Sequence, residues 1–338
     1  MAEQRILVVS PSWVGDMVMS QTLYSLLKKR NPNVYIDVMA PGASKPLLSR
    51  MADIHQSVLF DVGHSEVRFG YRARFASSLR SNQYDQAIVL PNSLKSALVP
   101  FLAKIPVRTG YRGEIRYILL NDIRRLDKAR LPRMIDRFMS LGLSPGEPLP
   151  EYKPPELIID QGNQEDCLKR FGLGRSPPAL GMCPGAEFGD AKRWPEEKFA
   201  EVAQGAIETG MQVWLFGSAG DRAMCEKIVQ RLSKSQQKSC KNLSGRTTLL
   251  DAIDLLNLCP QVLSNDSGLM HIAAAVGCRT LVLYGSSSPD FTPPLTVKHS
   301  IIRKTVPCSP CFKRKCPLGH KNCLNLISSE SVLAQLEG

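Results

Sequence analysis

The sequence lacks long hydrophobic runs. None approaches the roughly 20 apolar residues that a helix needs to span a bilayer, and the N-terminal segment MAEQRILVVS contains an apolar run of only four residues. A secretory signal peptide has a central apolar region of about 7–15 residues. We therefore expect a cytoplasmic protein, whose ten cysteines are thiols or metal ligands rather than disulfides.

Three motifs for nucleotide and metal binding are also missing. Neither half of the chain has Gly-x-Gly-x-x-Gly after its first predicted strand, and no Walker A lysine motif occurs. The chain has no Asp-x-Asp pair to hold a divalent metal against a diphosphate. These absences argue against a nicotinamide-dependent dehydrogenase, a P-loop NTPase and a metal-dependent diphosphate site.

What is present is an alternation of strands and helices over 338 residues. Apolar runs of strand length fall at residues 5–10, 34–39, 84–91, 178–183, 211–216, 261–264 and 279–284, and another lies around Leu59. Helical segments between such strands predict parallel sheets covered on both faces. The fold class is therefore α/β, with two Rossmann-like doubly wound domains facing each other. We place them at residues 1–150 and 176–325, with a proline-rich linker at 151–175 and a C-terminal helix at 326–338.

Positive charge is concentrated in the first half of the chain. The formal net charge is +12, and residues 1–150 contain 21 Lys and Arg against 12 Asp and Glu, or +9, whereas the rest contains 22 against 19, or +3. A basic surface favours an anionic partner such as nucleic acid, a membrane face or an acidic glycolipid. A solvated basic face without a partner is the alternative.

The segment SNDSGLMHIAAAVG, residues 264–277, joins a buried strand to a helix. Asp266 and Ser267 are N-cap candidates, and Gly268 lets the backbone approach a ligand closely. A helix N-terminus offers free N–H groups and the positive end of the helix dipole, which suits a phosphate or diphosphate. His271 lies one turn into this helix. The alternative is an ordinary capped helix with a packed histidine.

Further candidates follow other predicted strands, where open α/β sheets bind ligands. The loop CPGAEFGDAKRWP, residues 183–195, combines glycines with Glu187 and with Lys192, which can reach a phosphate. Asp16 opens the first helix, where the dipole stabilises its carboxylate; a simple N-terminal helix acid is the alternative. Polar and basic candidates also follow strands in the first half of the chain: Asn92, Ser93, Lys95, Arg108 and Arg112. The alternative for the two arginines is simple surface charge.

The chain resembles the lipopolysaccharide inner-core heptosyltransferases from Ile6 to about Leu295. Six segments carry the resemblance: PSWVGDMVMSQTLYSLLKKRNP, VLPNSLKSALVPF, TGYRGEIRYILLND, CPGAEFGDAKRWP, SNDSGLMHIAAA and LYGSSSPDFTPPL. Their combination is specific, although each would be weak alone. The resemblance implies the GT-B fold and an inverting, metal-independent transfer of L-glycero-D-manno-heptose from ADP-heptose, with release of ADP. PSWVGDM and NSLKSALVP favour the first heptose of Kdo2-lipid A-heptose as acceptor.

The resemblance also implies roles for the candidate residues. Asp16 would be the general base. Lys192 with Gly185, Ala186, Ser267 and Gly268 would stabilise the diphosphate. Glu187, Asp266 and His271 would complete the donor site, with Asp251 placed for the ribose hydroxyls. Acceptor contacts would come from Asn92, Ser93, Lys95, Arg108 and Arg112. No cofactor is required, and we expect a monomer at the cytoplasmic face of the inner membrane.

A cysteine-rich tail lies outside the segments that carry the resemblance. The sequence CSPCFKRKCPLGHKNC supplies Cys308, Cys311, Cys316 and Cys323. The C-x2-C start is typical of metal sites, whereas the later spacings match no common zinc module. Structural zinc and reduced thiols therefore both stay open, and the spacings favour reduced thiols.

Two rival functions remain at this point. One keeps the fold and the donor but changes the acceptor to Kdo, as in heptosyltransferase I, or to an outer-core heptose. The other is a basic protein that binds nucleic acid or a membrane without catalysis. The basic half has no recognisable nucleic-acid module, so we expect no nucleic-acid partner.

Overall fold

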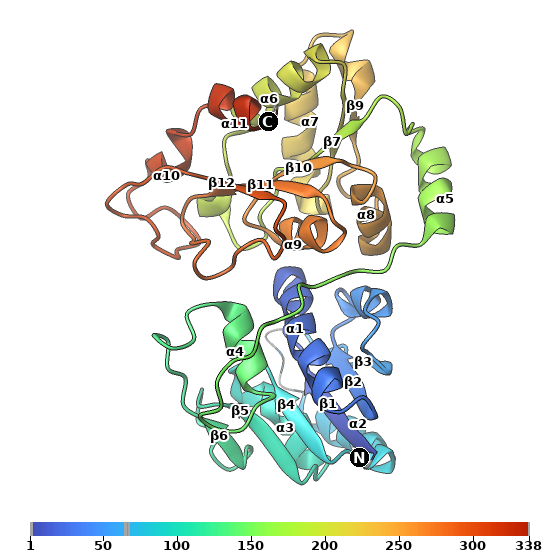
Figure 1. The fold of residues 1–338 in the computed structure, drawn as a ribbon, viewed down its shortest axis with the longest axis vertical. Coiled ribbons are helices and arrows are strands. Elements are labelled where there is room, and N and C mark those ends of the chain that lie inside the picture. The colour runs from blue at the N-terminus through green and yellow to red at the C-terminus, as the bar shows by residue number, and fades with distance from the viewer. Residues whose placement is uncertain (1–2, 64–65, 67, 337–338) are drawn as a thin grey trace. The chain divides into compact units, whose positions relative to one another are not determined.

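The computed structural model describes residues 3–63, 66 and 68–336. The chain divides into two compact units, Met1–Pro155 and Glu156–Gly338, which are coloured blue to green and green to red in Figure 1. Each unit contains one six-stranded sheet. All strand pairs within the two sheets are parallel.

The sheet of unit 1 has the order β3-β2-β1-β4-β5-β6. Its strands are β1 (Gln4–Val9), β2 (Val34–Ala40), β3 (Gln56–Leu59), β4 (Gln86–Val89), β5 (Val107–Tyr111) and β6 (Asp122–Arg124). Its helices are α1 (Val14–Arg30), α2 (Phe69–Leu79), α3 (Leu94–Leu102) and α4 (Met134–Ser140), with 3-10 turns at Lys45–Arg50 and Arg80–Asn82. The chain order reverses between β1 and β4, which makes this pair the switch point of a doubly wound sheet.

Unit 2 repeats the same topology, with the order β12-β11-β10-β7-β8-β9. Its strands are β7 (Ala179–Cys183), β8 (Gln212–Leu215), β9 (Cys240–Asn242), β10 (Gln261–Asn265), β11 (Arg279–Tyr284) and β12 (His299–Arg303). Its helices are α5 (Gln161–Phe171), α6 (Glu196–Glu208), α7 (Arg222–Gln230), α8 (Leu249–Leu256), α9 (Gly268–Ala275), α10 (Asn322–Asn325) and α11 (Ser329–Leu336), with 3-10 turns at Asp190–Lys192, Ala219–Asp221 and Gln236–Ser239. Here the switch point lies between β7 and β10.

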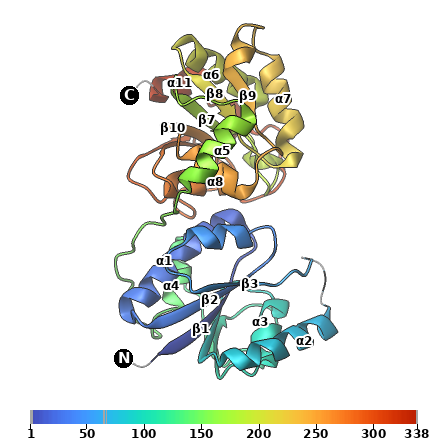
Figure 2. The same cartoon turned by 90° about the vertical axis from the view of Figure 1, so that its right-hand side faces the viewer.

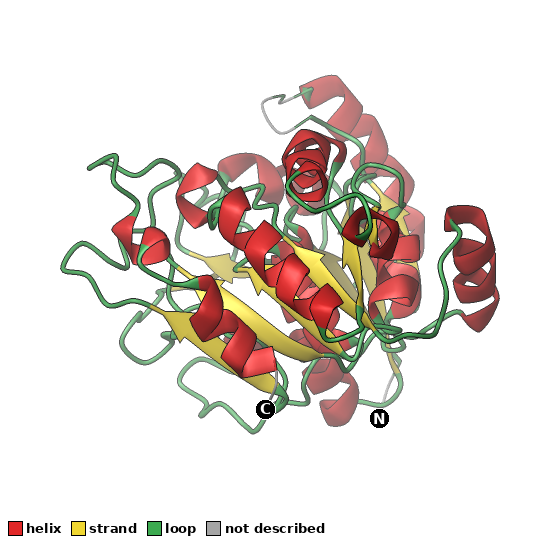
Figure 3. Cartoon of the chain, turned by 90° about the horizontal axis from the view of Figure 1, so that it is seen from above, coloured by secondary structure: helices red, strands yellow, loops and turns green. Residues whose placement is uncertain are grey.

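Helices cover both faces of the strands, as Figure 3 shows in red and yellow. In β11 the side chains of Leu281 and Leu283 pack into the core beneath α6, α7 and α11, whereas Val282 and Tyr284 pack with Met270 of α9. Alternate residues of a strand point to opposite faces, so a continuous apolar run is buried on both sides. The predicted pair of doubly wound α/β domains is confirmed.

The linker between the units is shorter than predicted. Residues 161–171 of the expected linker form α5, which lies beside α8 in Figure 2. The side-chain amide of Gln164 donates to the carbonyl of Asp254 at 2.9 Å, and the Asn163 amide donates to the Asp254 carboxylate at 2.7 Å. These bonds fix α5 to unit 2.

The C-terminal helix was predicted, and it forms as α11 against α6 of the same unit. Leu333 fills the space over Gly205, where an added Cβ would lie 2.7 Å from a leucine methyl carbon. Residues 337 and 338 of the predicted range lie outside the described residues. No helix within the described residues combines the length and the hydrophobicity that a membrane span requires.

Candidate active site

The predicted donor residues other than Asp251 lie at the switch point of unit 2. Cys183 at the end of β7 pairs with Ser264 near the end of β10. The loop from residue 184 to residue 194 and the start of α9 therefore leave the sheet side by side. This edge is where open α/β sheets bind their ligands.

Lys192 and Asp266 form the central ion pair of this site. The ammonium Nζ of Lys192 lies 2.5 Å from Oδ2 of Asp266, and the two side chains are only 16% and 4% exposed. The hydroxyl of Thr292 contacts the other oxygen of Asp266 at 3.4 Å. The ring of Phe188 lies 5.1 Å beneath the ammonium. The carboxylate and the aromatic ring thus fix the Lys192 ammonium at the strand ends.

Asn265 was not predicted, yet it joins the two halves of the site. This fully buried side chain donates from Nδ2 to the carbonyl of Pro184 at 2.6 Å and accepts the N–H of Trp194 at 3.2 Å. Both ends of the loop that carries Lys192 are therefore tied to β10. The sequence signal was an amide residue at the end of a buried strand, within SNDSG.

The first turn of α9 presents N–H groups at the same edge. Ser267 is the N-cap residue in an extended conformation, but its side chain makes no capping hydrogen bond; its hydroxyl lies 3.2 Å from the hydroxyl of Ser264. The N–H groups that begin at Gly268 are thus not satisfied by the cap, and such groups attract anions. Of the two predicted N-cap candidates, Ser267 rather than Asp266 occupies the N-cap position, and it makes no capping hydrogen bond.

His271 lies one turn into α9 and is 4% exposed. Its Nδ1 is buried without a hydrogen-bond partner among the described residues. Burial lowers the pKa of this imidazole to about 4, an effect that Asp266 opposes and Lys192 reinforces. The ring is therefore neutral at pH 7, so it offers a hydrogen bond rather than a charge.

Gly185 and Ala186 are buried, whereas Glu187 is exposed. A Cβ on residue 185 would lie 2.5 Å from the carboxyl group of Asp221, so only glycine fits there. That carboxylate in turn accepts the N–H and hydroxyl of Ser218 at 2.9 and 2.8 Å. Asp221 was not predicted, because its importance depends on packing between distant loops.

Asp251 serves mainly to stabilise α8. Its carboxylate accepts the Thr248 N–H at 2.9 Å in a capping box and pairs with Arg170 at 2.8 Å. Burial alone would raise the pKa of this carboxyl, but the hydrogen bonds from Thr248, Arg170 and Cys167 lower it to about 2. These partners already occupy its oxygens, so the geometry favours a structural role over a ribose contact.

Asp16 lies at the switch point of unit 1. Val9 of β1 pairs with Val89 of β4, so α1 and α3 both begin at the carboxyl edge of these strands. Asp16 is half-buried in the first turn of α1, where the helix dipole stabilises a carboxylate. Its predicted position is confirmed, whereas its role as base stays a prediction.

Arg116 organises the predicted acceptor residues and was itself missed. This guanidinium is 2% exposed and donates to the carbonyls of Pro91 at 2.7 Å and Tyr111 at 2.6 Å, and to Oδ1 of Asn92 at 3.2 Å. It also reaches the carbonyl of Ser93 at 3.2 Å. Arg116 therefore joins the loop after β4 to the loop after β5. No local pattern in TGYRGEIRY identifies the buried arginine among exposed ones.

The other predicted acceptor residues differ in what they offer. Lys95 is half-buried at the start of α3, and Arg112 is exposed with its Nε 2.8 Å from the hydroxyl of Tyr117. Arg108 instead donates to the carbonyls of Leu119 at 2.8 Å and Ile105 at 2.6 Å, which favours a supporting role for it. Burial lowers the pKa of its guanidinium.

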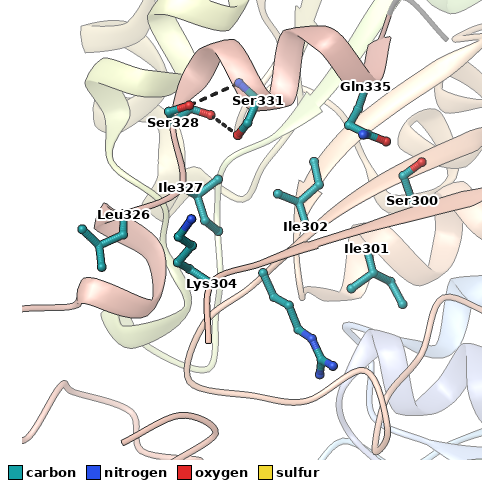
Figure 4. A pocket seen from close by; sticks show the side chains of 10 residues that line it. Ser300, Ile301, Ile302, Lys304, Leu326, Ile327, Ser328, Ser331 and Gln335 are labelled. Carbon is teal, nitrogen blue, oxygen red and sulfur yellow. Dashed lines mark hydrogen bonds between the residues drawn. The ribbon is translucent and has the colours of Figure 1, made fainter. Parts of the chain in front are cut away.

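Unit 2 also has a groove of about 440 Å³ between β12 and the helices α10 and α11 (Figure 4). Ile302, Ile327 and Lys304 line it, and Ser331 at its rim bonds Ser328. None of the residues predicted to bind the donor lines this groove. The candidate donor residues therefore lie away from this groove.

The family model of glycosyltransferase family 9 (heptosyltransferase) matches residues 72–322. The chain belongs to glycosyltransferase family 9. It is 46% identical to lipopolysaccharide heptosyltransferase 2 of Escherichia coli (strain K12) over 98% of this chain and 97% of that relative. It is 48% identical to lipooligosaccharide heptosyltransferase 2 of Haemophilus influenzae over 88% of each.

Solved structures of this family have the same fold. The structure of E. coli ADP-heptose lps heptosyltransferase II matches with a TM-score of 0.89 at 44% identity, covering 99% of this chain and 98% of that one. The ADP complex of E. coli heptosyltransferase WaaC matches with a TM-score of 0.74 at 17% identity, covering 99% of each chain. The predicted GT-B fold and the predicted family are both confirmed.

Proposed function

We propose that this family 9 glycosyltransferase moves L-glycero-D-manno-heptose from ADP-heptose to the first heptose of the lipopolysaccharide inner core and releases ADP. The observation that carries the proposal is the 46% identity, over nearly the whole length of both chains, to lipopolysaccharide heptosyltransferase 2. The acceptor is the least constrained part, because a few loop residues of unit 1 select it.

In the proposed donor site, unit 2 stabilises the diphosphate without a metal. The Lys192 ammonium and the N–H groups at Ser267 and Gly268 lie where negative charge develops on the leaving ADP, and preorganised donors of this kind lower the barrier. Gly185 and Ala186 keep the loop close to the phosphates. Neutral His271 adds a buried hydrogen-bonding nitrogen.

In the proposed reaction, Asp16 acts as the general base. The acceptor hydroxyl oxygen attacks the anomeric carbon as the bond from that carbon to the diphosphate oxygen breaks. The electron pair of that bond leaves with ADP, and the hydroxyl proton passes to the Asp16 carboxylate. Attack from the face opposite the leaving group inverts the anomeric centre. A weak base is sufficient if the transition state resembles an oxocarbenium ion.

Unit 1 also has a surface suited to an anionic, lipid-linked acceptor. Ile115 and Ile118 are 83% and 82% exposed beside Arg112, and exposed basic residues follow at Arg125 and Lys128. Apolar and basic side chains together favour the surface of an anionic membrane. We therefore propose peripheral attachment to the cytoplasmic face of the inner membrane. In a flotation assay with anionic vesicles, the Ile115→Ser, Ile118→Ser double variant should no longer float with the vesicles. The control Ile158→Ser, which changes an exposed residue of unit 2, should still float with them.

A transfer assay in EDTA tests the proposal. It uses ADP-heptose with acceptors that end in Kdo or in the first heptose, and it measures the release of ADP. Release with the heptose-ended acceptor alone is expected. Release with the Kdo-ended acceptor would move the enzyme one step earlier, and release that needs added Mg²⁺ would contradict the metal-independent mechanism. No release with either acceptor would reject the proposed activity.

A further inference from the structure

Four cysteines of the tail line one small cavity in unit 2. Cys308, Cys311, Cys316 and Cys323 surround a volume of about 20 Å³ together with His320. All ten cysteines of the chain are free thiols. The other six are buried in the interior of unit 2, so these four form a separate group brought together by the fold.

The turn after Cys316 is closed by a backbone hydrogen bond. The carbonyl of Cys316 accepts the N–H of Gly319 at 3.2 Å, and Gly319 has a φ of +73°, which favours glycine. Pro317, Leu318 and His320 in this turn also line the cavity, so the turn forms part of its wall.

The four thiols line the same cavity. Four thiolates in that space would repel one another, and a bound cation would remove that repulsion. The same segment contains the exposed basic residues Lys313, Arg314 and Lys315, which offset the net negative charge of a metal bound to four thiolates.

We propose that Cys308, Cys311, Cys316 and Cys323 bind one zinc ion as a structural tetrathiolate site. Zinc prefers four tetrahedral thiolate or imidazole ligands, and closed four-ligand sites are structural. Binding replaces four S–H bonds by four Zn–S bonds and releases the protons to solvent. Within the described residues no group of three or more His, Cys, Asp or Glu side chains is arranged to hold a metal ion. Binding as proposed would therefore require the four thiols to move together by rotation about their side-chain bonds.

The site has a structural consequence for the donor loop, because the two segments are in direct contact. The carbonyl of Arg314 accepts the N–H of Ala191 at 3.1 Å, next to Lys192. A Cβ on residue 189 would lie 2.4 Å from that carbonyl, and Lys321 pairs with Asp190 at 3.1 Å. Zinc would thus hold the cysteine segment against the loop that carries Lys192. This consequence rests on the proposed function, whereas zinc binding itself does not.

Metal analysis of the full-length chain, purified without a metal-chelating column, tests the site. We expect about one zinc per chain. Replacement by Co²⁺ should give the intense thiolate-to-cobalt charge-transfer absorption of a tetrathiolate. Cys308→Ser and Cys316→Ser should each lose the metal, whereas Cys240→Ala, a buried cysteine away from the cavity, should retain it.

Several results would overturn the proposal. One is a reduced, folded chain that binds neither zinc nor cobalt. Thiol alkylation and mass spectrometry could instead find a disulfide between Cys308 and Cys311. If the chain then takes up no zinc after reduction, these two cysteines form a redox pair and not a metal site. Iron in place of zinc would reject the choice of metal. Loss of metal in His320→Ala would reject the four-cysteine ligand set.

Calorimetric titration with ADP separates the site from its consequence. ADP should bind several-fold more weakly to the zinc-free chain than to the zinc-loaded chain. Equal affinities would reject the effect on the donor loop and leave the zinc site intact. Failure of both forms to bind ADP would instead reject the proposed function.

Discussion

The ammonium of Lys192 lies 2.5 Å from the carboxylate of Asp266, although 74 residues separate the two along the chain. The ion pair holds Lys192 at the edge of the sheet. If a diphosphate binds here as proposed, the Asp266 carboxylate would repel it, and the lysine would neutralise Asp266 as well as attract the ligand. ADP would then compete with Asp266 for part of the lysine's charge.

Lys192→Ala should weaken ADP binding and slow transfer together. A hydrogen bond to a charged group contributes about 1.5–3 kcal/mol, which corresponds to roughly a 10- to 150-fold change in affinity. ADP titration and initial rates measure the two effects. Lys241→Ala, on the exposed surface of β9, is the matched control. An unchanged rate for Lys192→Ala would remove this residue from the site.

Asp16→Asn should abolish transfer and leave ADP binding nearly intact, because the amide keeps the shape but cannot accept the acceptor proton. General base catalysis contributes roughly 10²–10⁴-fold to a rate. Single-turnover transfer and ADP titration measure the two properties separately. Asp166→Asn, on the exposed surface of α5, should change neither. Lost ADP affinity with retained turnover would contradict the assignment.

Arg116→Lys should raise the KM for the acceptor without changing the affinity for ADP. The lysine keeps the charge but cannot bridge the carbonyls of Pro91 and Tyr111 that the guanidinium joins. Each buried acceptor left without its donor costs about 1–3 kcal/mol, so urea unfolding should also show a less stable unit 1. Arg74→Lys, exposed on α2, should behave as wild type. If the variant is less stable but its KM for the acceptor is unchanged, Arg116 contributes to folding and not to acceptor binding.

The sequence predicted the fold well because both sheets are parallel and buried on both faces. Strands such as Arg279–Tyr284 then appear as unbroken apolar runs. The short edge strands β6 and β9, three residues each, gave no such signal. Helix α5 falls within the predicted linker because the neighbouring prolines obscure its helical pattern, although Asp160 caps it by accepting the N–H of Asn163.

Reasoning from motifs reaches only the candidate residues that follow a strand end. Lys192, Asp266, Ser267 and Gly268 meet at one edge because parallel strands place their carboxyl ends together. Asn265, Asp221 and Arg116 act by joining segments far apart in sequence, and no local pattern reveals such a contact. The three are supporting residues, which is why motif reasoning proposed the candidate chemical groups but missed the residues that position them.

The stability of unit 2 should fall as the pH drops from 7 to 5, because His271 is buried in its neutral form. Its folded pKa of about 4 lies below the ordinary value of 6.5, so between these values the unfolded chain binds a proton that the folded chain refuses. Stability therefore decreases as pH falls through this window. For this group alone, the loss at pH 5 relative to pH 7 is on the order of 2 kcal/mol.

Urea unfolding in a Trp13→Phe background measures this effect, since the remaining tryptophans, Trp194 and Trp214, both lie in unit 2. His271→Gln should flatten the pH dependence over this range, because the amide does not titrate. His299→Gln, exposed on β12, should leave it unchanged. The same slope in His271→Gln and in the parent would mean that another group titrates. If ADP occupies the site as proposed, saturating ADP should raise the free energy of unfolding of unit 2 at pH 7. This stabilisation should be absent in Lys192→Ala.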